Sequence, residues 1–236
     1  MSAGSASGEV AVVIPARNEA DRIQATVTAA LGLPAVALVI VIDDGSKDAT
    51  AAAARRAGAI VTRHARNRGK GAALETGAEA VRLLDQREQR DRPRHLLFLD
   101  ADLGGTAALA GPLIEPVVAG TADMTIAVFA TTVKLGGHGL VVGLSGAGIR
   151  RATGWRPAQP LNGQRCLTRA AFEAARPLAH GWGVETALSI DLLRKGLRVT
   201  EVEVELAHRA TGTGMRAQLH RAHQLTDVAR ALATRL

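Results

Sequence analysis

The stretch VALVIVIDDGSKD, residues 36–48, indicates the fold class most directly. Its first seven residues are apolar and mostly β-branched, and they end at two aspartates and a glycine. A run that is apolar on both faces is typical of a strand buried in a parallel sheet. Three further runs show the same pattern, at Val10–Ile14, Ala59–Thr62 and Leu96–Leu99. The sequence therefore predicts a sheet of buried parallel strands.

The stretches that separate these runs have helical composition and cover residues 20–31, 48–57 and 71–84. Asp48 resembles an N-terminal helix cap, and Gly58 follows the second helix as a stop signal. Strands and helices that alternate with short connections predict a doubly wound α/β sheet, in which ligands bind at the carboxyl edge of the strands. In the second half we expect strands at residues 123–129 and 199–206 and a closing amphipathic helix at residues 215–236.

Composition limits the class of protein. The chain has 236 residues and is 47% hydrophobic, which is enough for one large domain or two small ones. The single cysteine, Cys166, excludes a disulfide framework and a Cys-based zinc cluster. The longest apolar run, residues 35–42, is too short to span a bilayer. Residues 1–8 are expected to form a disordered tail rather than a signal peptide. We expect a cytoplasmic protein, and peripheral contact with the inner membrane face stays open.

The net charge of +7 suggests an anionic partner. With three Phe, two Trp and no Tyr, the chain offers little aromatic surface on which bases could stack, so we expect no nucleic-acid partner. The basic residues are scattered and nearly all arginine. A phosphorylated small molecule or an anionic lipid head group fits this pattern.

Polar residues follow the predicted strands. Asp100 and Asp102 come directly after a buried strand, and two carboxylates at this spacing can face one ligand. Mg²⁺ and Mn²⁺ prefer such oxygens together with phosphate oxygens. The alternative is a plain acidic turn. Asp43 and Asp44 could accept hydrogen bonds from a base or ribose, whereas Ser46 and Asp48 are typical of a turn and a helix cap.

Residues 66–71, RNRGKG, open a helix with glycines and basic side chains, which favours phosphate. The spacing is not that of a P-loop, and an ordinary basic loop is the alternative. Two further segments, Pro15–Glu19 and Gly181–Glu185, are each compatible with a simple helix start, and His208 with a surface histidine. Trp155 and Trp182 are expected to be packing residues.

Four motifs in order resemble those of GT-A-type nucleotide-sugar glycosyltransferases of the family 2-like group. They are Pro15–Glu19, Val41–Asp48, Asn67–Gly71 and Leu99–Asp102, and they span the first half of the chain. The resemblance implies a Rossmann-like, mostly parallel sheet and sugar transfer from a nucleotide-diphosphate sugar with Mg²⁺ or Mn²⁺. It also implies a single domain over residues 9–236, with a nucleotide-sugar half at 9–104 and an acceptor half at 105–236.

The second half resembles the family more loosely. Asn162–Arg165, Gly183–Glu185 and His208 are similar to segments of glucosyl-3-phosphoglycerate synthases and polyprenyl-phosphate glycosyltransferases. Many inverting relatives carry Glu-Asp where this chain has Glu185 and Thr186, which leaves the stereochemical outcome open. The resemblance implies that the acceptor is a small molecule or a polyprenyl phosphate. Whether the chain forms a homo-oligomer stays open. Residues 135–149 could form a lid, a shelf for a prenyl chain, or an ordinary loop and short helix.

The resemblance also implies roles for individual residues. The metal ligands are Asp102 and His208, and Glu185 is the catalytic residue that orients or deprotonates the acceptor. The nucleotide-binding residues are Pro15, Ala16, Arg17, Asn18, Glu19, Asp44, Lys70, Asp100 and Ala101. The acceptor-binding residues are Asn162, Gly163, Gln164 and Arg165.

Two other function classes remain. A nucleotidyltransferase that makes a nucleotide sugar also uses such a sheet, a metal and carboxylates. It would carry a Gly-rich signature after the first strand, where this chain has Pro-Ala-Arg-Asn-Glu. A non-catalytic nucleotide-sugar-binding protein is the third class. The presence of Lys70, Asp100, Asp102 and His208 is evidence against it, because a scaffold does not need a metal site.

Overall fold

The computed structural model describes residues 9–129, 139–206 and 215–236, and for residues 215–222 it describes the backbone only. The first eight residues and His208 therefore lie outside the described residues. The elements, in chain order, are β1 (Val10–Ala16), α1 (Ile23–Leu31), β2 (Val36–Asp43), α2 (Thr50–Arg56), β3 (Ile60–Arg63), α3 (Lys70–Arg87), β4 (His95–Phe98), η1 (Gly104–Ala110), α4 (Gly111–Val118), β5 (Met124–Phe129), α5 (Gly139–Thr153), β6 (Arg165–Leu167), α6 (Arg169–Ala175), η2 (Gly181–Gly183), α7 (Val184–Arg194), β7 (Val199–Val204) and α8 (Met215–Ala233).

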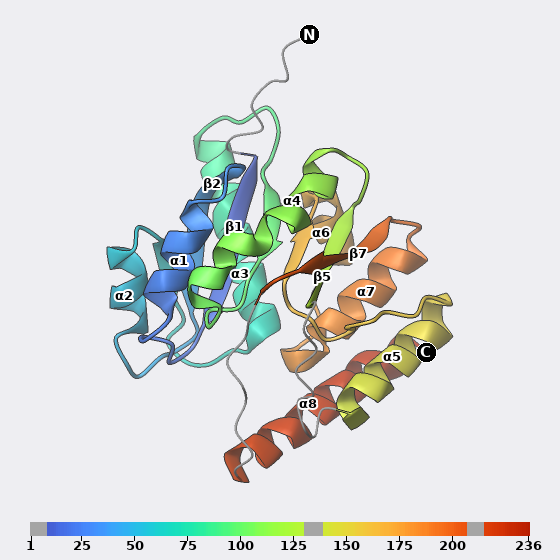
Figure 1. Ribbon diagram of the computed structural model, residues 1–236. Coiled ribbons are helices and arrows are strands. Elements are labelled where there is room, and N and C mark those ends of the chain that lie inside the picture. The colour runs from blue at the N-terminus through green and yellow to red at the C-terminus, as the bar shows by residue number, and fades with distance from the viewer. Residues whose placement is uncertain (1–8, 130–138, 207–214) are drawn as a thin grey trace.

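The strands form one seven-stranded sheet in the order β3-β2-β1-β4-β6-β5-β7 (Figure 1). Strand β1 pairs in parallel with β2 and β4, and β2 pairs in parallel with β3. Strand β6 is antiparallel to both β4 and β5, whereas β7 runs parallel to β5. The predicted doubly wound, mostly parallel α/β sheet is confirmed. The three-residue strand β6 is an addition that the hydrophobic pattern did not predict.

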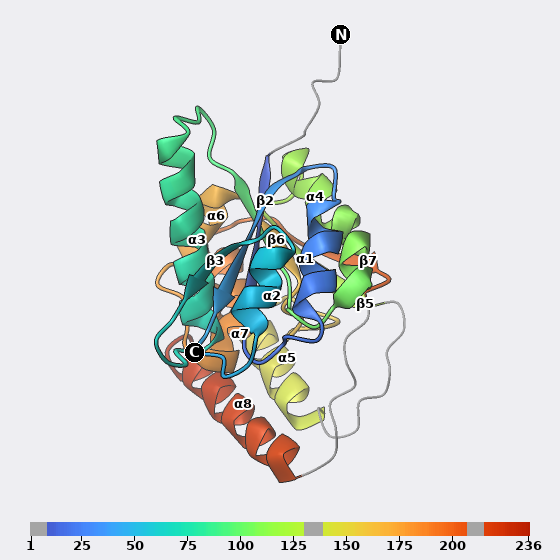
Figure 2. The same ribbon diagram turned by 90° about the vertical axis from the view of Figure 1, so that its left-hand side faces the viewer.

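Each face of the sheet is covered by its own helices because side chains alternate along every strand. On one face, Val10, Val12 and Ile14 pack with residues of α1, α2, η1 and α4. On the other, Ala11 and Val13 pack with residues of α3, α6 and α7. Figure 2 shows α1 and α4 on one side of the sheet and α3 and α6 on the other.

Helices α5 and α8 form an outer layer on α7 and lie side by side at the lower end of the molecule in Figure 1. The small apolar cluster between these helices consists of Val141, Ile149, Ile190, Val228 and Leu232. The predicted closing helix is present as α8. Of residues 135–149, the last eleven belong to α5, and the first four lie outside the described residues. In the described parts of the chain, we find no helix with the length and apolar character needed to cross a membrane.

A charged segment, residues 86–94, is exposed to solvent over most of its length but ends in a buried arginine, Arg94. This arginine is 5% exposed, and its Nη1 donates to Asp85 Oδ1 at 2.5 Å. Its backbone N–H donates to the second oxygen of Asp85 at 2.9 Å, and Glu88 binds its Nη2. Arg94 can be buried because its charge is paired with Asp85 and Glu88, whereas residues 86–89 and 91–93 are exposed.

Candidate functional site

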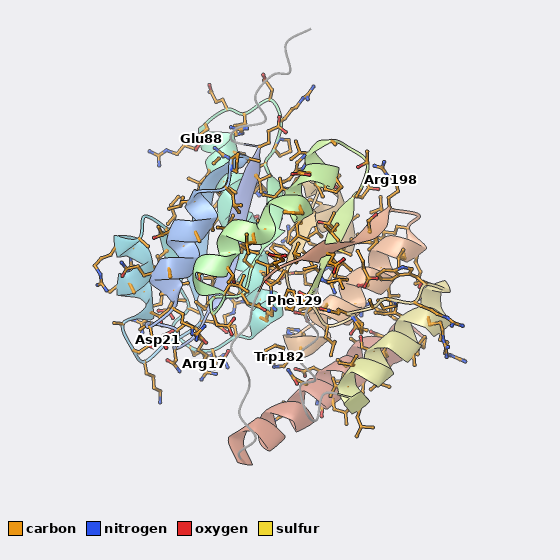
Figure 3. The ribbon with its side chains drawn as sticks, viewed as in Figure 1. Arg17, Asp21, Glu88, Phe129, Trp182 and Arg198 are labelled. Atoms are coloured by element: carbon orange, nitrogen blue, oxygen red, sulfur yellow. The ribbon has the colours of Figure 1, made fainter. Side chains whose placement is uncertain are left out.

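A cleft of about 530 Å³ opens at the carboxyl ends of the parallel strands. It is lined by Pro15, Ala16, Arg17, Glu19, Asp44, Asn67, Gly69, Lys70, Ala73, Asp100, Ala101, Asp102, Gly181, Trp182, His223 and Asp227. Figure 3 shows Arg17 and Trp182 at the same end of the molecule, and Glu88 and Arg198 at the opposite end. The cleft is therefore formed by the loops after β1, β2 and β4, by the first residues of α3, by η2 and by the middle of α8.

Lys70 links two carboxylates, that of Asp100, which lines the cleft, and that of Glu185, which is 4% exposed and is not among the lining residues. Lys70 Nζ lies 2.8 Å from Asp100 Oδ1 and 2.9 Å from Glu185 Oε1. Burial alone would lower the pKa of Lys70, but the two carboxylates outweigh burial and raise its pKa above the ordinary value of 10.5. Because the folded-state pKa is the higher one, the stability that Lys70 contributes is fully present below about 10.5 and is lost only as the pH rises through the folded-state pKa. Lys70 is therefore charged at neutral pH.

Gln164 and Gly163 shape the surroundings of this lysine. The Asp100 backbone N–H donates to Gln164 Oε1 at 2.7 Å, and Gln164 Nε2 donates to Asp100 Oδ2 at 2.6 Å. A Cβ at Gly163 would lie 2.2 Å from Lys70 Nζ and 3.3 Å from the Asp100 carboxylate. A residue larger than glycine would displace the ammonium group. Both residues precede β6, whose place beside β4 brings them to Asp100.

Arg165 does not reach the cleft. It is 1% exposed, and its guanidinium donates to the carbonyl oxygens of Asn162 (2.8 Å), Glu185 (3.0 Å) and Pro160 (3.1 Å) and to Ser189 Oγ (3.0 Å). Burial lowers the pKa of Arg165 to about 10, against the attraction of Glu185 and Glu201, so the group stays charged at neutral pH. The guanidinium holds the backbone before β6 against α7. This placement corrects the expected acceptor contact, because the side chain is enclosed.

Asp44 binds the loop that precedes Lys70. Its Oδ1 accepts the backbone N–H of Arg68 at 2.8 Å, and its Oδ2 accepts that of Gly69 at 2.9 Å. The buried His64 Nδ1 lies 2.7 Å from Asp44 Oδ1. Sequence reasoning did not single out His64, because this histidine comes directly after β3 and is followed only by a basic loop. Asp44 both lines the cleft and fixes the loop that carries Lys70.

Asn18 is the one residue of the Pro15–Glu19 motif that does not line the described cleft. Its backbone N–H donates to Ser46 Oγ at 3.0 Å, and its Oδ1 accepts the Lys47 N–H at 2.8 Å. Asn18 adopts a φ of +57°, which asparagine tolerates better than most residues. It joins the loop after β1 to the loop after β2.

Asp102 lines the cleft two residues after Asp100. Of the two predicted metal ligands, it is the one that lies among the described residues. No group of three His, Cys, Asp or Glu side chains that could hold a metal occurs among the described residues, and the predicted ligand His208 is not one of them. Mg²⁺ and related ions commonly use one or two protein carboxylates and complete their coordination with phosphate oxygens and water. The carboxylates at the cleft fit this kind of site.

Two cleft residues, His223 and Asp227, come from α8 and were missed by sequence reasoning. They are four residues apart and therefore lie on one face of the helix. The sequence pattern predicted an amphipathic helix here. A polar pair at this spacing is typical of the solvent-exposed face of such a helix. Only the docking of α8 shows that the pair faces the cleft.

Comparison with known proteins places the chain among glycosyltransferases. The sequence model of the family described as Glycosyl transferase family 2 matches residues 11–138, more than half of the chain. An uncharacterized protein of Methanocaldococcus jannaschii is 35% identical over 118 residues, which are 50% of this chain and 45% of that protein. The glycosyltransferase AglJ of Haloferax volcanii is 29% identical over 208 residues, 86% of this chain and 65% of that protein. The chain thus matches about half to two thirds of the length of these relatives.

Solved structures give the same fold. Glucosyl-3-phosphoglycerate synthase from Mycobacterium tuberculosis, in complex with phosphoglyceric acid, superimposes with a TM-score of 0.77 at 26% identity and covers 96% of this chain and 79% of that chain. The same enzyme with Mn²⁺, uridine diphosphate and glucosyl-3-phosphoglycerate gives a TM-score of 0.74 at 25% identity, with coverage of 96% and 79%. Its complex with Mg²⁺ and uridine diphosphate gives 0.72 at 25% identity, with coverage of 96% and 78%.

Proposed function

Because the chain belongs to glycosyl transferase family 2, we propose that it transfers a sugar from a nucleotide-diphosphate sugar to an acceptor, with a divalent metal as cofactor. One observation of the structure supports this most strongly. A lysine whose side chain is 12% exposed, Lys70, lies between Asp100 and Glu185 at the cleft on the carboxyl edge of the sheet. A cation and carboxylates in one cleft suit a reaction in which a diphosphate leaves with added negative charge.

The donor that we propose is a UDP-sugar, since solved relatives bind uridine diphosphate. Residues Pro15–Glu19 and Asp44 would hold the uracil and ribose, together with Asp100 and Ala101. Lys70 would approach the pyrophosphate. For the acceptor we propose a phosphate-bearing small molecule or a polyprenyl phosphate, which fits the net charge of +7. We place the reaction in the cytoplasm, with peripheral membrane contact where the acceptor is a lipid.

The metal would be held by Asp102, with His208 as a further ligand. When bound, Mg²⁺ or Mn²⁺ supplies charge neutralisation for the leaving diphosphate. In the transfer itself, the bond between the sugar C1 and the diphosphate oxygen breaks and its electron pair leaves with UDP. The acceptor oxygen forms the new bond to C1, and where this oxygen belongs to a hydroxyl group it loses its proton. Glu185 is the residue that we propose to orient the acceptor or receive this proton.

A transfer assay tests the function. Radiolabelled UDP-glucose and other nucleotide sugars are incubated with the protein and candidate acceptors, with and without Mn²⁺. Metal-dependent release of UDP together with a labelled product supports a glycosyltransferase. Net release of pyrophosphate would instead indicate a nucleotidyltransferase, and binding with no release of either product would indicate a non-catalytic protein.

For Asp102→Ala, we expect UDP to lose the part of its affinity that depends on Mn²⁺. One carboxylate fewer on the metal weakens the link between protein and diphosphate, and a fall in affinity of about tenfold or more is expected from the loss of one charge contact. Calorimetry with UDP, with and without Mn²⁺, measures this. Asp21→Ala, an exposed aspartate outside the described cleft, serves as the control. Wild-type affinity in the Asp102 variant would remove this residue from the metal site.

For Glu185→Gln, we expect turnover to fall by about a hundredfold or more while UDP-sugar binds with near-normal affinity. A glutamine cannot take a proton and holds Lys70 less strongly. If Glu185 served only as the buried partner of Lys70 and of the α7 N-terminus, its replacement would lower the free energy of unfolding and leave turnover intact. Steady-state kinetics and urea unfolding of the same variant separate the two roles. Unchanged turnover would exclude Glu185 from the chemistry.

A further inference from the structure

We propose that Asp227, on the C-terminal helix α8, is a positioning residue of the active site. It fixes the turn η2 that carries Trp182 and, through that turn, the placement of Glu185 beside Lys70. The inference rests on the proposed function for its kinetic part only. In this proposal α8 holds active-site residues in place, in addition to packing against α5 and α7.

Asp227 contacts the backbone of η2 directly. Its Oδ2 accepts the backbone N–H of Trp182 at 3.1 Å. Gly181 has a φ of +58°, and a Cβ there would lie 1.9 Å from Asp227 Oδ2. A Cβ at Gly183 would lie 2.6 Å from the Asp227 carbonyl oxygen. The helix can approach this closely only because both turn positions are glycine.

The turn leads straight into the groups that the proposed reaction uses. Helix α7 begins at Val184, directly after η2, so Glu185 lies in its first turn. The Trp182 ring centroid is 5.9 Å from Lys70 Nζ, within the range of a cation–π contact. A shift of η2 would therefore move Trp182 and Glu185 together relative to Lys70. Misplacement of reacting groups by about 1 Å is enough to slow a reaction strongly.

The hydrogen bond to Trp182 is the contact through which Asp227 acts. The side chain of Asp227 is 22% exposed, and its other oxygen lies 3.8 Å from Arg230 Nη1. The Arg230 side chain is 78% exposed, and an ion pair of this kind contributes little. A carboxylate that accepts a backbone N–H forms a charge-assisted bond. Asparagine can keep an acceptor oxygen at this place, whereas alanine cannot.

The experiment compares Asp227→Ala, Asp227→Asn and the control Arg230→Ala in a Trp155→Phe background, where Trp182 is the single tryptophan. We measure Trp182 emission, the dissociation constant for UDP with Mn²⁺, and kcat and KM. For Asp227→Ala we expect a shifted emission, a kcat lower by about tenfold or more, and UDP affinity within about threefold of the parent protein. Asp227→Asn should restore emission and kcat to within about threefold, and Arg230→Ala should change neither.

Several outcomes would overturn the proposal. Parental emission and kcat in Asp227→Ala would show that the hydrogen bond positions nothing. Equal loss in the Ala and Asn variants would assign the effect to charge. A loss of UDP affinity as large as the loss of kcat would make Asp227 a donor-binding residue. If the parent protein transfers no sugar, the proposed function fails, and Trp182 emission alone decides the proposal, since it must shift in the Ala variant and return in the Asn variant.

Discussion

Replacing Lys70 by methionine is expected to lower turnover by about a thousandfold. A unit charge about 4 Å from a developing charge, at an effective dielectric near 20, contributes roughly 4 kcal/mol, and every 1.4 kcal/mol is about tenfold in rate. The methionine keeps most of the side-chain volume beside Gly163 but removes the cation between Asp100 and Glu185. The leaving diphosphate therefore loses a charge partner, and the two carboxylates lose their counter-ion.

The rate is measured as UDP release with the donor and acceptor that the transfer assay identifies. Circular dichroism at the assay temperature establishes that the variant is folded. Lys47→Met is the matched control, since Lys47 is exposed and lies outside the described cleft. It should keep turnover within about twofold, as surface substitutions usually do. A folded Lys70 variant with turnover within about tenfold of wild type would contradict the proposed role.

Replacing Arg165 by leucine is expected to cost about 3–5 kcal/mol of unfolding free energy. The buried guanidinium donates hydrogen bonds to three backbone carbonyl oxygens and to Ser189 Oγ. Each buried polar group that loses its partner costs about 1–3 kcal/mol, partly offset by no longer burying a charge. The loss also loosens the start of α7, because one of the carbonyl groups is that of Glu185.

Urea denaturation followed by circular dichroism measures this loss. Arg150→Leu, at an exposed position on α5, is the control and should change the unfolding free energy by less than about 0.5 kcal/mol. A loss below about 1 kcal/mol in Arg165→Leu would mean that water replaces the guanidinium at little cost. The carbonyl groups would then not depend on this arginine.

The first half of the fold could be predicted because its strands are buried on both faces. Strands β1, β2 and β4 coincide with apolar runs, and their ends place the polar motifs at one edge. The prediction ended β1 at Ile14, whereas the strand continues through Pro15 to Ala16. Beyond Val13, β1 has lost β4 as a neighbour, since Val13 pairs with Phe98, the last residue of β4. A proline is tolerated there because that side of the strand requires no N–H donor.

The rest of the site depends on contacts that no local pattern encodes. Strand β6 is three residues long and includes the buried Arg165, so it has neither an apolar run nor an alternation. Gln164 is recognisable as a partner of Asp100 only when β6 lies beside β4. His223 and Asp227 join the cleft through the docking of α8. Periodicity predicts which side of an element is buried, but it does not predict which distant element covers it.

The antiparallel strand β6 also has a consequence for the order in which the molecule assembles. Strands β1, β2 and β3 are neighbours both along the chain and in the sheet, so each pairing between them closes only a short loop of chain. Phe98 meets Arg165 only after the whole intervening stretch has been closed, at a larger cost in chain entropy. Gln164 cannot reach Asp100 before that closure. The loops after β1 and β2 can therefore form early in folding, whereas the meeting of Asp100 and Gln164 at the cleft requires two long-range pairings, β1 with β4 and β4 with β6.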